Sequence, residues 1–227
     1  MQDDYGSPLF AALRDACAAE WEGYVAHPFV AGLGDGSLPR AAFLTYLRQD
    51  YLFLVHFARA WALAAAKSDR IEEMRACAGT LHALIGEEMK LHIAICAREG
   101  IDEAALAAEP EAPATLAYTR YVIDAGLSGD LLDLLVALAP CVMGYGEIGR
   151  RLAGAAPGGF HGEWIGTYAD PGYQQVCREV GALIETVAAR RLGPDPTVSP
   201  RWPELAAGFG TACRLEADFW SMGLAAG

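Results

Sequence analysis

The chain has 227 residues, of which 53% are hydrophobic and 20% charged, which excludes a disordered chain and allows one large core. Its formal net charge is −12, and its 17 Lys and Arg residues are scattered along the sequence. No basic stripe offers counterion release from phosphates, so this balance excludes a direct nucleic-acid binder. We expect a single domain over residues 1–227, because no linker divides the chain.

Helical periodicity runs through nearly the whole sequence, and no stretch alternates like a strand. Ser7-Pro8 and Ser199-Pro200 resemble a cap followed by a first-turn proline, and Asp69 with Glu72 resembles a capping box. The predicted helices span about residues 7–26, 39–66, 69–99, 114–125, 130–152, 162–168, 171–191 and 200 onward. The sequence therefore predicts an all-α bundle of about seven or eight helices.

The first residues, the apolar stretches and the cysteines indicate the compartment in which we expect the protein to work. The first residues are acidic and polar, unlike a secretory signal, and His56, Arg59 and Asp133 interrupt the longest apolar stretches. We therefore expect no membrane-spanning segment. The six cysteines form no C-x-x-C pair and lie in helical patterns, which favours reduced thiols in a cytoplasmic protein.

One cysteine lies in an unusual segment, residues 138–149. Cys141 directly follows Pro140, which removes a backbone hydrogen bond and is expected to kink the helix. Tyr145, four residues later, is expected to share a helical face with Cys141. Glycines at 144, 146 and 149 let another backbone or a ligand approach closely. The alternative is a buried cysteine that packs as a small hydrophobe.

Two acidic residues interrupt apolar helical stripes. Asp50 shares a face with Tyr46 and Phe53, and Glu216 lies within the stripe that contains Cys213 and Phe219. A carboxylate on an apolar face must be paired, neutralised or used in chemistry. Each acid could be part of a buried ion pair, but two of them with an odd cysteine favour a functional site.

Glu88 and His92 lie four residues apart on one helix and allow two interpretations. Carboxylate and imidazole at this spacing can share a metal ion, but a di-iron bundle needs about four carboxylates and two histidines. The last two long helices contain no histidine. A buried hydrogen-bonded pair between helices explains Glu88 and His92 equally well, and we expect no metal or other cofactor.

No basic side chain lies within one turn of Cys141 on its face. A free thiol has a pKa of about 8.5, and lowering it takes a neighbouring cation or a helix N-terminus. Nearby acids would instead raise this pKa. We therefore expect thiol attack coupled to proton transfer onto the substrate, with a carboxylic acid of raised pKa as the proton donor.

Six fragments occur in the order seen in the thiaminase II (TenA) family, which has a haem-oxygenase-like helical fold. They are Phe43-Leu-Thr-Tyr-Leu-Arg-Gln-Asp50-Tyr, Glu88-Met-Lys-Leu-His92, Leu116-Ala-Tyr118-Thr-Arg-Tyr, Pro140-Cys141 with Tyr145 and Ile148-Gly149, Trp164-Ile-Gly-Thr-Tyr168, and Leu215-Glu216-Ala-Asp-Phe219-Trp220. Each fragment alone is weak, but the ordered set resembles this family over nearly the whole chain.

The resemblance implies an aminopyrimidine aminohydrolase without a cofactor, usually homotetrameric, that serves thiamin salvage. The implied substrate is 4-amino-5-aminomethyl-2-methylpyrimidine or thiamin, and the product is the 5-hydroxymethyl compound. Cys141 would be the nucleophile, and Glu216 would protonate a ring nitrogen. The implied substrate-binding residues are Asp50 at the amino edge, Phe53 and Phe219 on the ring faces, and Tyr118, Tyr145 and Tyr168 near the thiol.

Two residues depart from the family pattern. Phe53 lacks a hydroxyl that some members carry, and Met143 replaces a frequent tryptophan, so substrate choice stays open. Two other functions are also considered: a regulatory or pyrimidine-binding protein without catalysis, and a metal-dependent oxidase on the same fold.

Overall fold

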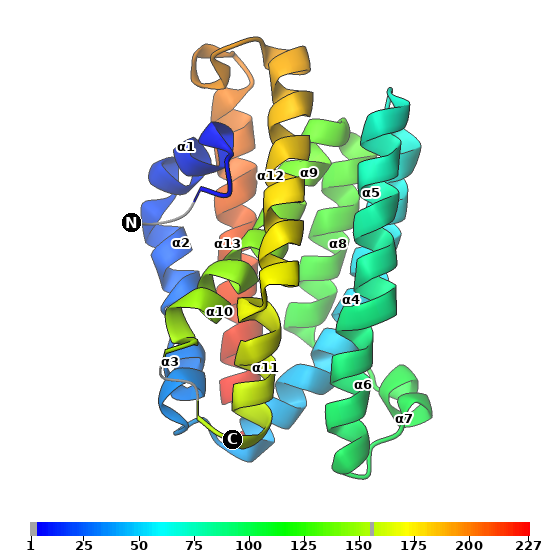
Figure 1. Ribbon diagram of the computed structural model, residues 1–227, viewed down its shortest axis with the longest axis vertical. Helices are drawn as coiled ribbons and strands as arrows, with labels where there is room; N and C mark the ends of the chain where they lie inside the picture. Colours follow the sequence, from blue (N-terminus) through cyan, green and yellow to red (C-terminus); the bar gives the residue numbers. More distant parts are fainter. Residues whose placement is uncertain (1–3, 155–156) are drawn as a thin grey trace.

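The computed structural model describes residues 4–154 and 157–227, and all regular elements within these ranges are helical (Figure 1). In chain order they are α1 (Pro8–Ala16), α2 (Ala18–Val25), α3 (Pro28–Asp35), α4 (Arg40–Lys67), α5 (Ile71–Ala83), η1 (Leu84–Glu88), α6 (Met89–Arg98), α7 (Glu103–Ala108), α8 (Pro113–Ser128), α9 (Leu131–Ala139), η2 (Pro140–Gly144), α10 (Tyr145–Leu152), α11 (Gly159–Ala169), α12 (Pro171–Leu192), η3 (Pro196–Val198) and α13 (Trp202–Leu224). The predicted all-α class is confirmed.

The helices are more numerous than the seven or eight expected, for local reasons. The first predicted helix divides at Cys17, whose thiol donates to the Ala206 carbonyl 3.1 Å away on α13. Two short helices were not predicted, although both carry recognisable caps. His27 caps α3 ahead of Pro28, and the Asp102 carboxylate caps α7.

Two π-helical turns lie inside longer helices. The π turn η1 joins α5 to α6, and η2 joins α9 to α10. Pro140 is the first residue of η2, so the helix accommodates the missing N–H by widening its turn at the point where the sequence indicates a kink. Such turns occur frequently at functional sites, and these two carry Glu88 and Cys141.

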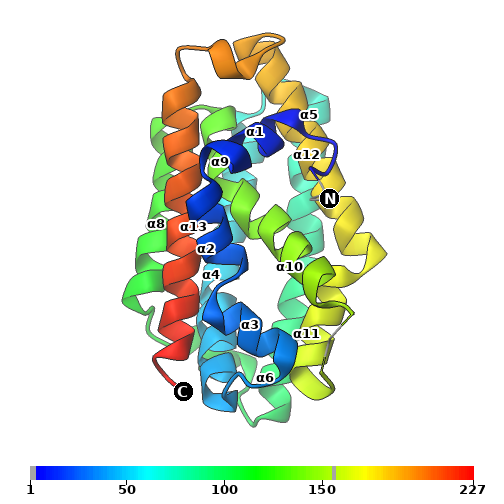
Figure 2. The same cartoon turned by 90° about the vertical axis from the view of Figure 1, so that its left-hand side faces the viewer.

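The α9–η2–α10 run passes through the middle of the bundle. The η2 turn contacts α12 and α13, and Figure 2 shows α10 between the N-terminal helices on one side and α12 on the other. Around this run, α13 packs against α2, α4, α8 and α9, while α12 packs against α5 and α9. Cys141 is therefore held near the centre of the molecule.

The Leu131–Leu152 run meets the length and composition of a membrane span, and 94% of its apolar window is buried inside the protein. The prediction that Asp133 interrupts this apolar run is wrong. Asp133 lies in the first turn of α9, where its carboxylate and that of Asp130 form a reciprocal capping box. The burial of the Leu131–Leu152 run is typical of a helix in the core of a protein.

The prediction of reduced thiols is confirmed for all six cysteines, which are free and buried. The prediction that one domain spans residues 1–227 stays a prediction.

Candidate active site

The π turn η2 leaves two backbone carbonyls available to side chains from other helices. The Tyr24 hydroxyl donates to the Pro140 carbonyl at 3.2 Å, and the Tyr173 hydroxyl donates to the Val142 carbonyl at 3.2 Å. The Cys177 thiol also approaches the Val142 carbonyl, at 3.5 Å. The turn that carries Cys141 is thus fixed from α2 and from α12.

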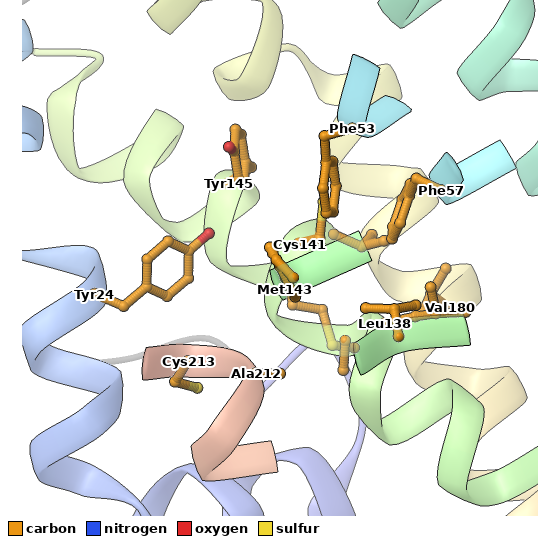
Figure 3. Packing of buried hydrophobic residues seen from close by; sticks show 14 of the residues in the cluster. Tyr24, Phe53, Phe57, Leu138, Cys141, Met143, Tyr145, Val180, Ala212 and Cys213 are labelled. Atoms are coloured by element: carbon orange, nitrogen blue, oxygen red, sulfur yellow. The ribbon is translucent and has the colours of Figure 1, made fainter. Parts of the chain in front are cut away.

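Cys141 is 6% exposed, and Figure 3 shows it among Tyr24, Phe53 and Tyr145. Burial raises the pKa of this thiol well above its usual value, and the nearby Glu216, Glu88 and Asp50 carboxyls raise it further. The expected direction of this shift is confirmed. Near neutral pH Cys141 is therefore a thiol and not a resting thiolate.

Glu216 on α13 is fully enclosed and accepts a hydrogen bond at Oε1 from the Tyr118 hydroxyl of α8, at 2.9 Å. Burial raises the pKa of Glu216 well above its usual value; the Tyr118 bond opposes this shift, while the charges of Asp50 and Glu88 reinforce it. Burial therefore favours the protonated form of Glu216, which can act as an acid.

Asp50 is paired with a histidine from another helix. The Asp50 Oδ2 accepts from the Tyr46 hydroxyl at 2.7 Å and lies 2.6 Å from the His92 Nε2. The His92 Nδ1 lies 3.0 Å from the Glu88 carbonyl, which can only accept, so Nδ1 carries a hydrogen. Burial lowers the pKa of His92, but the Asp50 carboxylate, the Glu88 carbonyl and the Glu88 carboxylate together outweigh burial, so the net pKa is raised. The two groups form a buried imidazolium–carboxylate pair.

The two residues considered as a metal pair, Glu88 and His92, bind different partners. The Tyr168 hydroxyl of α11 donates to the Glu88 Oε1 at 2.8 Å, whereas the His92 imidazole faces Asp50. Across residues 4–154 and 157–227, no three His, Cys, Asp or Glu side chains gather as a metal-binding group. Burial raises the pKa of Glu88 to about 7, so its carboxyl changes charge near neutral pH.

Aromatic rings form the walls of the site. The Phe53 ring lies 4.7 Å from that of Tyr118 at an angle of 30°, and 5.8 Å from that of Phe219 at 61°. Phe53 and Phe219 therefore meet as a corner, not as two parallel walls. On the opposite side the Tyr145 and Tyr168 rings lie 5.0 Å apart.

A cavity of about 690 Å³ opens beside these residues, between the α5–η1–α6 run and the α11–α12 segment. Cys141 and Glu216 do not line it, but their neighbours do: Val142 follows Cys141, and Phe57 stacks on Phe53 at 5.4 Å. Its lining residues are Phe57, Thr80, Ala83, Leu84, Glu88, Leu91, Val142, Glu163, Gly166, Thr167, Asp170, Gly172, Tyr173 and Val176.

The structure brings the sequence-predicted residues into one buried region, adds two that the sequence did not identify, and gives His92 its partner. Tyr24 and Tyr173 bind the π-turn carbonyls, and His92 is the partner of Asp50. The Glu88–His92 spacing was the available signal, and it allowed either a shared metal ion or a buried hydrogen-bonded pair between helices; His92 forms such a bond, but with Asp50. Met143 lies away from the cavity, and its methyl group packs against Gly181 of α12.

Comparisons with known proteins show the family to which the chain belongs. A sequence model of the TENA/THI-4/PQQC family matches residues 14–226. A Halalkalibacterium halodurans protein named aminopyrimidine aminohydrolase is 36% identical over 93% of this chain and 93% of its own length.

Two solved structures are also similar. A Silicibacter protein named a TenA family transcription regulator is 54% identical, with a TM-score of 0.93 over 96% of this chain and 97% of its own. A Shewanella denitrificans domain with a haem-oxygenase-like fold has a TM-score of 0.71 at 16% identity, covering 93% of this chain and 90% of its own, which shows the fold. With a family match from residue 14 to residue 226, the chain belongs to the TENA/THI-4/PQQC family and has the haem-oxygenase-like fold.

Proposed function

We propose that this chain is an aminopyrimidine aminohydrolase of thiamin salvage. It would convert 4-amino-5-aminomethyl-2-methylpyrimidine to the 5-hydroxymethyl compound, or release the same product from thiamin. Family membership and the 36% identical aminohydrolase support the reaction class. The observation that carries the proposal is a buried thiol and a buried carboxyl, Cys141 and Glu216, within electrostatic reach in one aromatic-walled site where burial raises the pKa of both.

The ring-binding roles follow from the hydrogen bonds that the site leaves unused. In the described part of the chain, Asp50 Oδ1 and Glu216 Oε2 accept no hydrogen bond, while the other oxygen of each is held. Asp50 can accept from an exocyclic amino group, and Glu216 can donate to a ring nitrogen. The Phe53–Phe219 corner supplies apolar contacts for the ring.

Tyr118, Tyr145 and Tyr168 complete the proposed binding site. Tyr118 orients the Glu216 carboxyl through its hydrogen bond. Tyr168 donates a hydrogen bond to the Glu88 carboxyl, and the Tyr145 ring packs beside the Tyr168 ring.

The chemistry begins with addition of the thiol to the ring. The Cys141 sulfur bonds to a ring carbon while Glu216 gives its proton to the ring nitrogen, and the thiol proton restores the Glu216 acid. The electron-rich adduct then expels the amine from the exocyclic methylene. Water adds to the methylene, and reversal of the first step releases Cys141. One water is consumed and one ammonia is formed.

This proposal needs no cofactor, and it includes a cytoplasmic location and a homotetramer as expected for the family.

The name of the Silicibacter relative raises a second candidate, a regulatory protein. The net charge of −12 disfavours direct DNA contact. A gel shift of duplex DNA by the purified protein, weakening with salt, would support regulation.

The proposed activity is tested by mass-spectrometric detection of the 5-hydroxymethyl product from the 5-aminomethyl substrate. We expect the wild type to form product and both Cys141→Ala and Cys141→Ser to lose turnover while retaining the fold. Cys96→Ala, at a buried thiol on α6, is the matched control and should remain active. Unchanged turnover in either Cys141 variant would overturn the assignment.

A further inference from the structure

Glu88 is the one carboxyl at the site that also lines the 690 Å³ cavity. Part of its surface is accessible, because it faces the cavity, although protein surrounds the side chain. Its charge acts on the Cys141 thiol, so the carboxyl lies within electrostatic reach of the nucleophile. Glu88 thus lies in the wall of the open cavity and within electrostatic reach of the nucleophile.

The hydrogen bonding of Glu88 leaves one oxygen available. Its Oε1 accepts from the Tyr168 hydroxyl at 2.8 Å, and its Oε2 has no hydrogen bond to any described residue. The nearest cation, the His92 imidazolium, lowers the pKa of Glu88 but is hydrogen-bonded to Asp50. A half-buried carboxylate that faces a cavity, and whose neighbouring cation is bound to another acid, is suited to a cationic ligand.

The proposed substrate is such a ligand. A primary alkyl amine is protonated near neutral pH, as the lysine side chain is, and carries its positive charge on the departing nitrogen. Asp50 already pairs with His92, and the enclosed Glu216, held by Tyr118, is biased by burial toward its neutral form. Among these three acids Glu88 is the one left to receive the cation.

We infer that Glu88 binds the departing amino group of the substrate and shares its proton, and that ammonia leaves through the adjoining cavity. This inference rests on the proposed function. The substrate amine and Glu88 share one proton: the pair is either an ammonium beside a carboxylate or a neutral amine beside a carboxylic acid. When the C–N bond breaks, its electron pair goes to nitrogen, and ammonia departs with that proton. Water then adds to the methylene and returns a proton to Glu88, which closes the cycle.

The competing explanation is that Glu88 only positions Tyr168. Glu88→Gln separates the two roles, because the amide oxygen can still accept from the Tyr168 hydroxyl but carries no negative charge. Glu163→Gln is the matched control: Glu163 lines the same cavity at its rim, where it is paired with Arg98.

The experiment compares two ligands that differ only at the exocyclic group. In the Cys141→Ala background, calorimetry measures binding of the aminomethylpyrimidine and of the hydroxymethylpyrimidine. We expect Glu88→Gln to weaken amine binding by about tenfold or more and alcohol binding by less than about threefold. Glu163→Gln should change neither. With Cys141 intact, Glu88→Gln should lower kcat on the aminomethyl substrate by about 10²-fold.

Equal effects on amine and alcohol binding, or no effect on either, would overturn the role of Glu88. Failure of the proposed function looks different, since the protein would then bind neither pyrimidine and the wild type would form no product.

Discussion

The contact between α10 and α11 provides a sharp test of how the site is built. At Gly149 of α10, an added Cβ would lie 2.5 Å from the Tyr168 carbonyl carbon and 2.7 Å from the Ala169 nitrogen. Both are backbone atoms, so Gly149→Ala can be accommodated only if α11 moves. That movement would displace Tyr168, whose hydroxyl holds the Glu88 carboxyl.

The expected loss of stability follows from two opposing effects. Overpacking of a tight contact costs about 1–3 kcal/mol, and a rigid backbone partner places this case at the upper end. Replacing glycine by alanine inside a helix returns about 1 kcal/mol. We therefore expect a net loss of about 2 kcal/mol, which lowers the Tm of a chain of this size by about 4–8 °C.

Thermal unfolding followed by circular dichroism measures this loss, together with turnover of the aminomethyl substrate. Gly23→Ala is the matched control, because Gly23 lies inside α2 with no atom within 4 Å of an added Cβ. The control should keep or slightly raise the Tm. If Gly149→Ala instead behaves like Gly23→Ala, the close helix contact does not constrain the site and the reasoning is wrong.

Three further predictions concern the titrating groups. Tyr118→Phe removes the hydrogen bond that lowers the pKa of Glu216, so the alkaline limb of the pH–rate profile should move to higher pH while kcat falls about tenfold. His92→Leu leaves the Asp50 carboxylate buried without its cation, and urea unfolding near pH 6 should show a loss of about 3–5 kcal/mol. The pKa of His92 is raised in the folded state, so its contribution to the free energy of unfolding is complete below the unfolded pKa of about 6.5. That contribution is lost as the pH rises through the folded pKa. The difference in unfolding free energy between wild type and His92→Leu should therefore narrow at alkaline pH. Iodoacetamide should alkylate Cys141 slowly at pH 7 and faster as the pH rises, as peptide mass spectrometry would show, and rapid labelling at pH 7 would indicate a resting thiolate.

The long helices could be predicted because their apolar periodicity is strong. The predicted caps at Asp69 and Ser199 are wrong, because α5 begins after Arg70 and α13 after Arg201, neither with a side-chain cap. The predicted 39–66 and 171–191 helices differ from α4 and α12 by only one residue at any end. Asp50 and Glu216 were identifiable because each interrupts an apolar stripe. A carboxyl at such a position needs a partner or a role, and this requirement is visible in sequence.

The partners of these acids were not predictable, because they come from other helices. Nothing in the sequence places His92 beside Asp50, 42 residues away, or Tyr168 beside Glu88, 80 residues away. The π turns were hidden for a related reason. Widening one turn changes which carbonyls are free, and only tertiary contacts such as that of Tyr24 reveal them.

The most direct test of the central claim is mass spectrometry of the protein quenched during turnover of the aminomethylpyrimidine. We predict an added mass equal to the pyrimidine fragment on the peptide that contains Cys141, present in the wild type and absent in Cys141→Ala. Product formation with no adduct on Cys141 and undiminished turnover in Cys141→Ala would contradict the account.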